Sequence, residues 1–188
     1  AANHDTEWLL NRRFTDPLGR VQSQHHFTAK FGSSTRMNKA PRVRKITKGK
    51  SWSHDELYAR FFHGPGFQVL EEANASKNAG HARVHQEALD RNAAPLPALL
   101  LEAIFQGVAA CEMTSGRMGL PHTAVEVRQL TDVELSAGPF DVYVSRNKDG
   151  SFDGVTMDSE KRPVVILKGY CTVDAGPVEH DSAEGGAA

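Results

Sequence analysis

The chain of 188 residues has little of several features that mark particular classes of protein. Two cysteines, Cys111 and Cys171, are too few for a disulfide framework or a zinc site, and they favour a reducing, cytoplasmic setting. Lysine and arginine number 22 against 23 acidic residues, so the net charge of −1 gives no overall attraction to nucleic acid or to an anionic membrane. The N-terminal residues lack the charged segment and apolar core of a signal peptide.

One apolar stretch stands out at residues 95–115, where the sequence is PLPALLLEAIFQGVAACEMTS. Apolar side chains fall on all sides of this segment, which predicts a long helix wrapped by the rest of the protein. Glu102, Gln106 and Glu112 and the short unbroken runs argue against a membrane span. Glu102 and Gln106 are four residues apart and therefore share one helical face. A carboxyl group inside such a helix costs free energy unless it has a partner or a function.

Short strands and turns surround this helix in the sequence. Alternating patterns and short apolar runs predict strands at 21–32, 68–73, 81–88, 122–130, 140–145, 152–157 and 164–173. Ser53 and Glu56 form a capping-box pattern, so a short helix is expected from residue 54 to residue 61 or 62. Turns or loops are expected at 74–80 and 116–121. An antiparallel sheet curled around the central helix would cover it on most sides, which predicts an α+β protein.

Two motifs resemble the dehydratase domains of polyketide synthases and polyunsaturated-fatty-acid synthases. The first is HGPGFQVLEE at 63–72, where the family more often has tyrosine in place of His63. The second is PALLLEAIFQ at 97–106, with Glu102 where the family usually has aspartate and Gln106 at its glutamine or histidine position. Members of this family are double hot dogs, in which two antiparallel sheets each wrap a long helix. The resemblance implies a hot-dog fold for this chain, as the second lobe of a double hot dog.

The resemblance divides the chain into four parts. Residues 1–32 would end a preceding hot-dog lobe, 33–50 would be a basic linker, 51–173 the hot-dog domain and 174–188 a disordered tail. The segment 33–50 has seven Lys or Arg residues and no acidic residue, so it is interpreted as a solvated linker or as a docking strip for an acidic partner. It has no aromatic side chain, which argues against binding of single-stranded nucleic acid.

The family eliminates water from a 3-hydroxyacyl chain held as a thioester on acyl carrier protein. The substrate is therefore carried on phosphopantetheine, and no further cofactor is implied. By this resemblance Glu102 is the acid that protonates the departing β-hydroxyl group, and Gln106 bonds either the acid or that hydroxyl. Hydroxide is a poor leaving group and needs a proton donor beside it, and an apolar wall disfavours the ionised form of a carboxyl group. The substrate pocket is expected to be shaped by His63, Gly64, Pro65 and Phe67.

Two departures from the family leave three hypotheses open. Glutamate at position 102 is one methylene longer than aspartate, which moves the acid by about 1 Å. No histidine of this chain begins the pattern His-x-x-x-Gly-x-x-x-x-Pro, which supplies the base in the family. The chain is expected to be the C-terminal portion of a dehydratase, inactive without a first lobe. The alternatives are a non-catalytic hot-dog module, which packs against other domains or binds acyl carrier protein, and a homodimeric hot-dog hydratase or thioesterase.

Two of the site residues also have a purely structural interpretation. Glu102 would then be a core carboxyl group satisfied by a neighbour, and His63 would cap the last carbonyl groups of the preceding helix. The expected partners are acyl carrier protein, a first hot-dog lobe or other synthase domains, and a second copy of the chain. Neither nucleic acid nor a membrane is expected as a partner.

Overall fold

The computed structural model of the protein describes residues 6–32, 46, 48–130 and 132–177. The chain divides into two compact units, Ala1–Lys39 and Ala40–Ala188. Most of the expected basic linker lies outside the described residues, and so does the expected tail beyond Pro177.

The first unit is a hairpin of two antiparallel strands, β1 (Thr6–Thr15) and β2 (Val21–Phe31). The strand expected at 21–32 is confirmed as β2, whereas β1 was not predicted because its short apolar patch does not alternate. Pairing with β2 makes it a strand. The turn between them is organised by the Asp16 carboxylate, which accepts the backbone N–H groups of Leu18 and Arg20, each at 2.9 Å. This is the hydrogen bonding by which aspartate favours turns.

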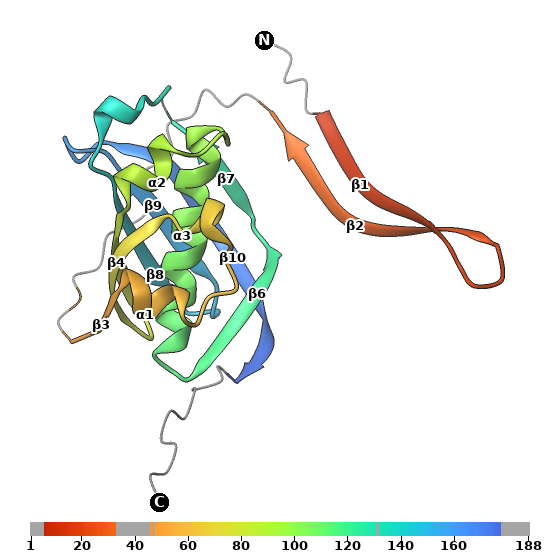
Figure 1. Ribbon diagram of the computed structural model, residues 1–188, viewed down its shortest axis with the longest axis horizontal. Helices are drawn as coiled ribbons and strands as arrows, with labels where there is room; N and C mark the ends of the chain where they lie inside the picture. The colour runs from red at the N-terminus through yellow and green to blue at the C-terminus, as the bar shows by residue number, and fades with distance from the viewer. Residues whose placement is uncertain (1–5, 33–45, 47, 131, 178–188) are drawn as a thin grey trace, which may run out of the picture. The chain divides into compact units, whose positions relative to one another are not determined.

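The second unit is an eight-stranded antiparallel sheet around one long helix (Figure 1). The strand order is β3-β4-β5-β8-β9-β10-β6, and β7 pairs with β10. The predicted architecture, a sheet wrapped around a central helix, is confirmed. The strands are β3 (Lys50–Ser53), β4 (Leu70–Ser76), β5 (Ala79–Val84), β6 (Arg117–Thr123), β7 (Glu126–Gln129), β8 (Asp141–Arg146), β9 (Phe152–Met157) and β10 (Pro163–Pro177).

Five helical segments accompany the sheet in the described residues. They are α1 (His54–Tyr58), η1 (Pro65–Phe67), α2 (Gln86–Asp90), α3 (Leu96–Met113) and η2 (Leu135–Ala137), of which η1 and η2 are single 3-10 turns. The capping box at the start of α1 is confirmed, but this helix ends at Tyr58, earlier than expected. α2 was not predicted and replaces the end of the strand expected at 81–88.

The central helix α3 packs closely on the sheet because glycines face it. A Cβ atom at Gly80 of β5 would lie 2.9 Å from the Cys111 sulfur, and one at Gly154 of β9 would lie 2.2 Å from a methyl carbon of Ile104. The buried Thr156 hydroxyl donates to the carbonyl of Leu100 at 3.0 Å and ties β9 to the helix. These contacts hold α3, and therefore its polar residues, in a fixed position relative to the sheet.

By length and composition alone, α3 would also be able to cross a membrane. Its 18 residues have a mean hydropathy of 1.4, but 56% of this window is buried inside the unit. Burial of this kind is typical of a core helix. The prediction of a helix wrapped by the protein is therefore confirmed for this segment.

Several predicted boundaries differ from the structure. β4 and β5 meet in a tight turn at residues 77–78, so the expected turn at 74–80 is mostly strand. The expected loop at 116–121 is part of β6, which pairs with the far end of β10. The local sequence, with two glycines and a proline, does not show this pairing because the partner is about 50 residues away. β10 itself continues through Pro177, four residues into the expected tail.

Candidate functional site

The site begins with the two polar residues in the middle of α3. Gln106 donates from Nε2 to Oε1 of Glu102 at 2.9 Å, so the predicted shared face is confirmed. The Gln106 residue is only 1% exposed, whereas the Glu102 side chain keeps 20% of its surface exposed. The carboxyl group therefore lies at the border between the core and the solvent, where a substrate can reach it.

His63 joins this pair from a distant part of the chain. Its Nε2 lies 2.9 Å from Glu102 Oε1, and its side chain is 16% exposed. The other ring nitrogen, Nδ1, is buried and has no hydrogen-bond partner among the described residues. The Phe62 ring stacks on the imidazole at a centroid distance of 4.6 Å, and Phe61 approaches it edge-on. The structure thus brings together the two motifs on which the resemblance rests.

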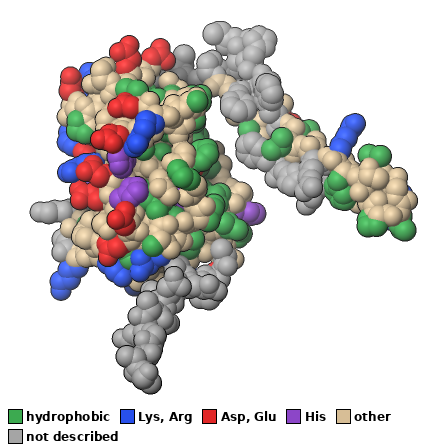
Figure 2. Space-filling model, in the orientation of Figure 1, with side chains coloured by type: hydrophobic (Ala, Val, Ile, Leu, Met, Phe, Trp, Pro, Cys, Tyr) green, Lys and Arg blue, Asp and Glu red, His purple; other side chains and the backbone are tan. Residues whose placement is uncertain are grey.

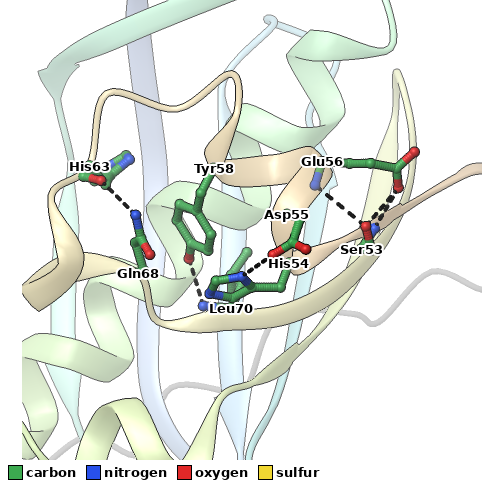
Figure 3. A network of polar contacts seen from close by, with 8 residues as sticks. All are labelled: Ser53, His54, Asp55, Glu56, Tyr58, His63, Gln68 and Leu70. Carbon is green, nitrogen blue, oxygen red and sulfur yellow. Dashed lines mark hydrogen bonds and ion pairs between the residues drawn. The ribbon is translucent and has the colours of Figure 1, made fainter.

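The chain around α1 sets the position of His63. Ser53 and Glu56 form a capping box at the start of α1 (Figure 3). The Glu56 backbone N–H donates to the Ser53 hydroxyl, and the Ser53 backbone N–H donates to the Glu56 carboxylate. The helix ends at Tyr58 with Ala59 as its C-cap. The His63 side chain does not cap it, because Nε2 faces Glu102 and Nδ1 has no hydrogen-bond partner among the described residues. The carbonyl of His63 instead accepts a hydrogen bond from the Gln68 side chain at 3.2 Å (Figure 3). The structural interpretation of His63 as a helix cap is therefore wrong.

Tyr58 also belongs to the hydrogen-bond network of Glu102 and Gln106, and no sequence pattern pointed to this role. Its hydroxyl accepts the backbone N–H of Leu70 at 2.7 Å (Figure 3) and donates to Oε1 of Gln106 at 2.5 Å. Burial raises the pKa of Tyr58 well above its usual value, the Leu70 N–H opposes this, and the nearby Glu102 carboxylate adds to it. The hydroxyl therefore keeps its proton at neutral pH. No local signal points to Tyr58, because Gln106 is 48 residues away along the chain.

The Gln106 amide is fully engaged by the protein. One N–H reaches Glu102, and Nε2 also donates to the carbonyl of Phe67 at 2.6 Å, while its oxygen accepts from Tyr58. A side-chain amide has two N–H donors, and both are used here. Of the two partners expected for Gln106, the acid or a substrate hydroxyl, this arrangement provides the acid.

The other residues expected in the pocket lie close by, with different surroundings. Phe67 contributes its carbonyl to Gln106 and keeps its side chain 52% exposed. Pro65 lines a cleft of about 480 Å³ on the α1 and α2 side of this segment, together with His54, Gln68, His85 and Arg91. A Cβ atom at Gly64 would meet no atom within 4 Å. Their role in binding a substrate stays a prediction.

Two residues with exposed aromatic rings contact the partners of Glu102, Phe62 through its ring on His63 and Phe67 through its carbonyl on Gln106. Phe62, which stacks on His63, is 68% exposed, and Phe67 is 52% exposed. Exposed phenylalanine side chains next to a polar site offer an apolar surface to a ligand. The site therefore combines a partly exposed carboxyl group at Glu102 with an exposed aromatic ring, Phe62, that reaches it through His63.

Comparison with known proteins identifies solved structures whose fold is similar to that of this chain. No protein-family model matches the chain, and no curated protein matches it. Among solved structures, the dehydratase domain from the CurF module of curacin polyketide synthase is similar, with a TM-score of 0.62 and 14% sequence identity over 90% of this chain. The dehydratase domain of the polyketide synthase PpsC from Mycobacterium tuberculosis gives a TM-score of 0.61 and 14% identity over 90% of the chain. A trans-AT polyketide synthase dehydratase domain from Brevibacillus brevis gives 0.60 and 13% over 89%.

The chain is shorter than these structures. It spans 65% of the curacin domain, 64% of the mycobacterial domain and 69% of the Brevibacillus domain. At such identities the similarity establishes the fold, and the chain has the hot-dog fold of polyketide synthase dehydratase domains.

Proposed function

We propose that the chain is the C-terminal part of a dehydratase that removes water from 3-hydroxyacyl thioesters on acyl carrier protein, with Glu102 as the acid. The observation that carries this proposal is the position of Glu102 on the central helix. Its carboxyl group is partly exposed, and the contacts from Gln106 and His63 both reach Oε1. The fold shared with polyketide synthase dehydratase domains supports the proposal.

The reaction follows from the chemistry of the leaving group. Glu102 gives its proton to the β-hydroxyl group while the carbon–oxygen bond breaks, so that water leaves and the carboxylate remains. A base takes the α-proton, and the electrons of that C–H bond form the new double bond. We assign the base to a lobe outside this chain, because no histidine here begins the family's base motif. Phe62 and Phe67 offer an apolar surface for the acyl chain.

A second candidate is a hot-dog module without catalytic activity that packs against another domain or a second copy. One observation favours it, namely the exposed aliphatic side chains near the β6 and β7 edge of the sheet. Figure 2 shows hydrophobic side chains gathered on the side of the unit where β6 and β10 lie. Exposed apolar surface on edge strands is typical of a protein interface. The exposed side chains are Leu120 at 43%, Val125 at 83%, Val127 at 50% and Val173 at 45%.

The decisive experiment supplies the full natural protein with a 3-hydroxyacyl acyl-carrier-protein thioester and follows the enoyl product by mass spectrometry. We expect product with the wild type, and a fall in kcat of about 10²- to 10⁴-fold in Glu102→Gln, because the proton donor is lost. Glu112→Gln on the same helix is the matched control and should stay within about twofold. An unchanged rate in Glu102→Gln would refute the assignment of the acid. Absence of product with the wild type would favour the non-catalytic module.

A further inference from the structure

A chain of hydrogen bonds connects a backbone N–H group to the Glu102 carboxyl group. The Leu70 N–H donates to the Tyr58 hydroxyl at 2.7 Å, and that hydroxyl donates to Gln106 Oε1 at 2.5 Å. Gln106 Nε2 then donates to Glu102 Oε1 at 2.9 Å. The chain crosses three elements, β4, α1 and α3, and its first member is part of the sheet.

Two backbone groups, the Leu70 N–H and the Phe67 carbonyl, fix which group donates and which accepts in each of these hydrogen bonds. A backbone N–H only donates, so the Tyr58 hydroxyl accepts from Leu70 and has its own proton left for Gln106. The Phe67 carbonyl only accepts, and it lies 2.6 Å from Gln106 Nε2. Both contacts select the same orientation of the Gln106 amide. One N–H of Gln106 therefore faces the Phe67 carbonyl and the other faces Glu102 Oε1, so that this oxygen is held as an acceptor.

The surroundings of the two His63 ring nitrogens indicate that His63 also donates a hydrogen bond to Glu102 Oε1. If its ring proton is on Nε2, it faces Glu102 Oε1 as a second donor at 2.9 Å. A proton on Nδ1 instead would be a buried donor with no acceptor among the described residues, which is unfavourable. The lone pair of Nε2 would then also face an oxygen that already acts as an acceptor. His63 is therefore a donor to Glu102 rather than a free base.

We propose that Tyr58 is a positioning residue for Glu102, and that the proton transferred by Glu102 is carried on Oε2. The inference rests on the proposed dehydratase function and assigns the roles within that site. Glu102 Oε2 gives its proton to the β-hydroxyl group, the C–O bond breaks, and water leaves. The negative charge that remains on Glu102 is met at Oε1 by the N–H groups already in place. Such donors, set before the reaction, cost no reorganisation when the charge forms.

The test compares Tyr58→Phe with Tyr143→Phe, in the full natural protein. Tyr143 is half-buried on β8 and contacts His81, so it provides the same chemical change away from the network. NMR measures the hydrogen exchange of the Gln106 side-chain amide, and turnover of the 3-hydroxyacyl carrier thioester gives kcat and KM. In Tyr58→Phe we expect exchange to rise about fivefold or more. We expect kcat to fall about 10- to 100-fold while KM stays within about threefold. Tyr143→Phe should change neither exchange nor kcat.

Each outcome decides between the inference and the proposed function. Faster exchange with a lower kcat supports the positioning role, whereas faster exchange with an unchanged kcat overturns it. Unchanged exchange in a folded Tyr58→Phe protein also overturns it. If the wild type makes no product but Tyr58→Phe still exchanges faster, the network stands and the proposed function fails.

A second pair of variants covers the case in which Tyr58→Phe does not fold. Gln106→Met removes the donor to Glu102 at similar volume, and Gln106→His keeps a ring N–H at that position. The inference predicts that kcat is at least about tenfold higher in Gln106→His than in Gln106→Met. The 15N shifts of His63 in the wild type should show a proton on Nε2 and none on Nδ1. Equal rates in the two variants, or a proton on Nδ1, would contradict the proposed arrangement.

Discussion

Glu102 and Glu112 are carboxyl groups on the same helix, and each has two polar contacts within the part of the chain that the structure describes. At Glu112 the contacts divide between the two oxygens, because the Gly119 N–H donates to Oε2 at 2.9 Å and the Thr172 hydroxyl donates to Oε1. At Glu102 both contacts, from Gln106 and His63, reach Oε1. The two groups differ in how their contacts are distributed, although the number of contacts is the same.

This difference separates a structural carboxylate from a candidate acid. Glu112 joins α3 to β6 and β10, and with each oxygen already bonded it is a tie between elements. Glu102 has its donors on one oxygen, and no contact to the other is found among the described residues, as the proposed acid requires. Asp141 shows that contact with histidine is not the distinguishing feature. Its Oδ1 lies 3.0 Å from His81 Nε2, but its Oδ2 is paired with Lys161, so it too has a partner on each oxygen.

The largest expected effect is the difference in kcat between Glu102→Asp and Glu112→Asp, two variants that shorten a glutamate on the same helix. Glu102→Asp withdraws the carboxyl group by about 1 Å from Gln106 and from the substrate, and we expect kcat to fall about 100-fold. Glu112→Asp changes a contact that serves stability, and kcat should stay within about twofold at a temperature where the protein is folded. The assay is enoyl product formation under saturating substrate. Equal losses in both variants would remove the distinction between the two carboxyl groups.

A smaller effect is expected from crowding the Glu112 contact. A Cβ atom at Gly119 would lie 2.5 Å from the Thr172 Cβ and 2.6 Å from its hydroxyl oxygen. We expect Gly119→Ala to lower the free energy of unfolding by about 1–3 kcal/mol, because packed side chains must shift. Gly66→Ala is the control, since a Cβ there meets no atom within 4 Å, and its effect should be below about 0.5 kcal/mol. Chemical denaturation measures both, and similar values for the two would argue against a tight contact at Gly119.

The smallest effect is expected from the pH dependence of Asp141. Burial acts to raise the pKa of Asp141, but Lys161 and His81 outweigh it, so that the pKa lies below its ordinary value of 3.8. A carboxyl group with a lowered pKa stabilises the fold above the unfolded pKa and loses this contribution as the pH falls through the folded value. The difference in unfolding free energy between the wild type and Asp141→Asn should therefore shrink from pH 5 to pH 3. A difference that is independent of pH would show that the ion pairs do not stabilise the fold.

Local sequence patterns were sufficient to predict the elements that are determined by residues close together in the chain. The apolar run around Glu102 predicted a buried central helix, because apolar side chains on all sides leave a helix no face for water. Ser53 and Glu56 predicted the start of α1, because a capping box satisfies two backbone groups within four residues. The strand at 152–157 was predicted with its observed limits, since clear turn signals bound this short segment on both sides.

Long-range pairing explains what the local patterns missed. β1 and β6 became strands through partners elsewhere in the chain, and neither has an alternating pattern of its own. Tyr58 entered the site because Leu57, beside it on α1, is buried in the core and because β4 returns to present the Leu70 N–H. The contacts of β6 and Tyr58 lie beyond any one turn or hairpin, whereas β1 pairs with the next strand of its own hairpin, β2.

The sequence by itself determined that this protein has a central apolar helix carrying Glu102 and Gln106 on one face, because helical periodicity depends only on spacing along the chain. The tertiary structure decided how the contacts are distributed over the oxygens of the helix's two carboxyl groups, Glu102 and Glu112. That arrangement depends on which oxygen each donor reaches. Gln106 lies one turn from Glu102 on the same helix, but the donors at residues 63, 119 and 172 reach the two carboxyl groups only in the tertiary structure.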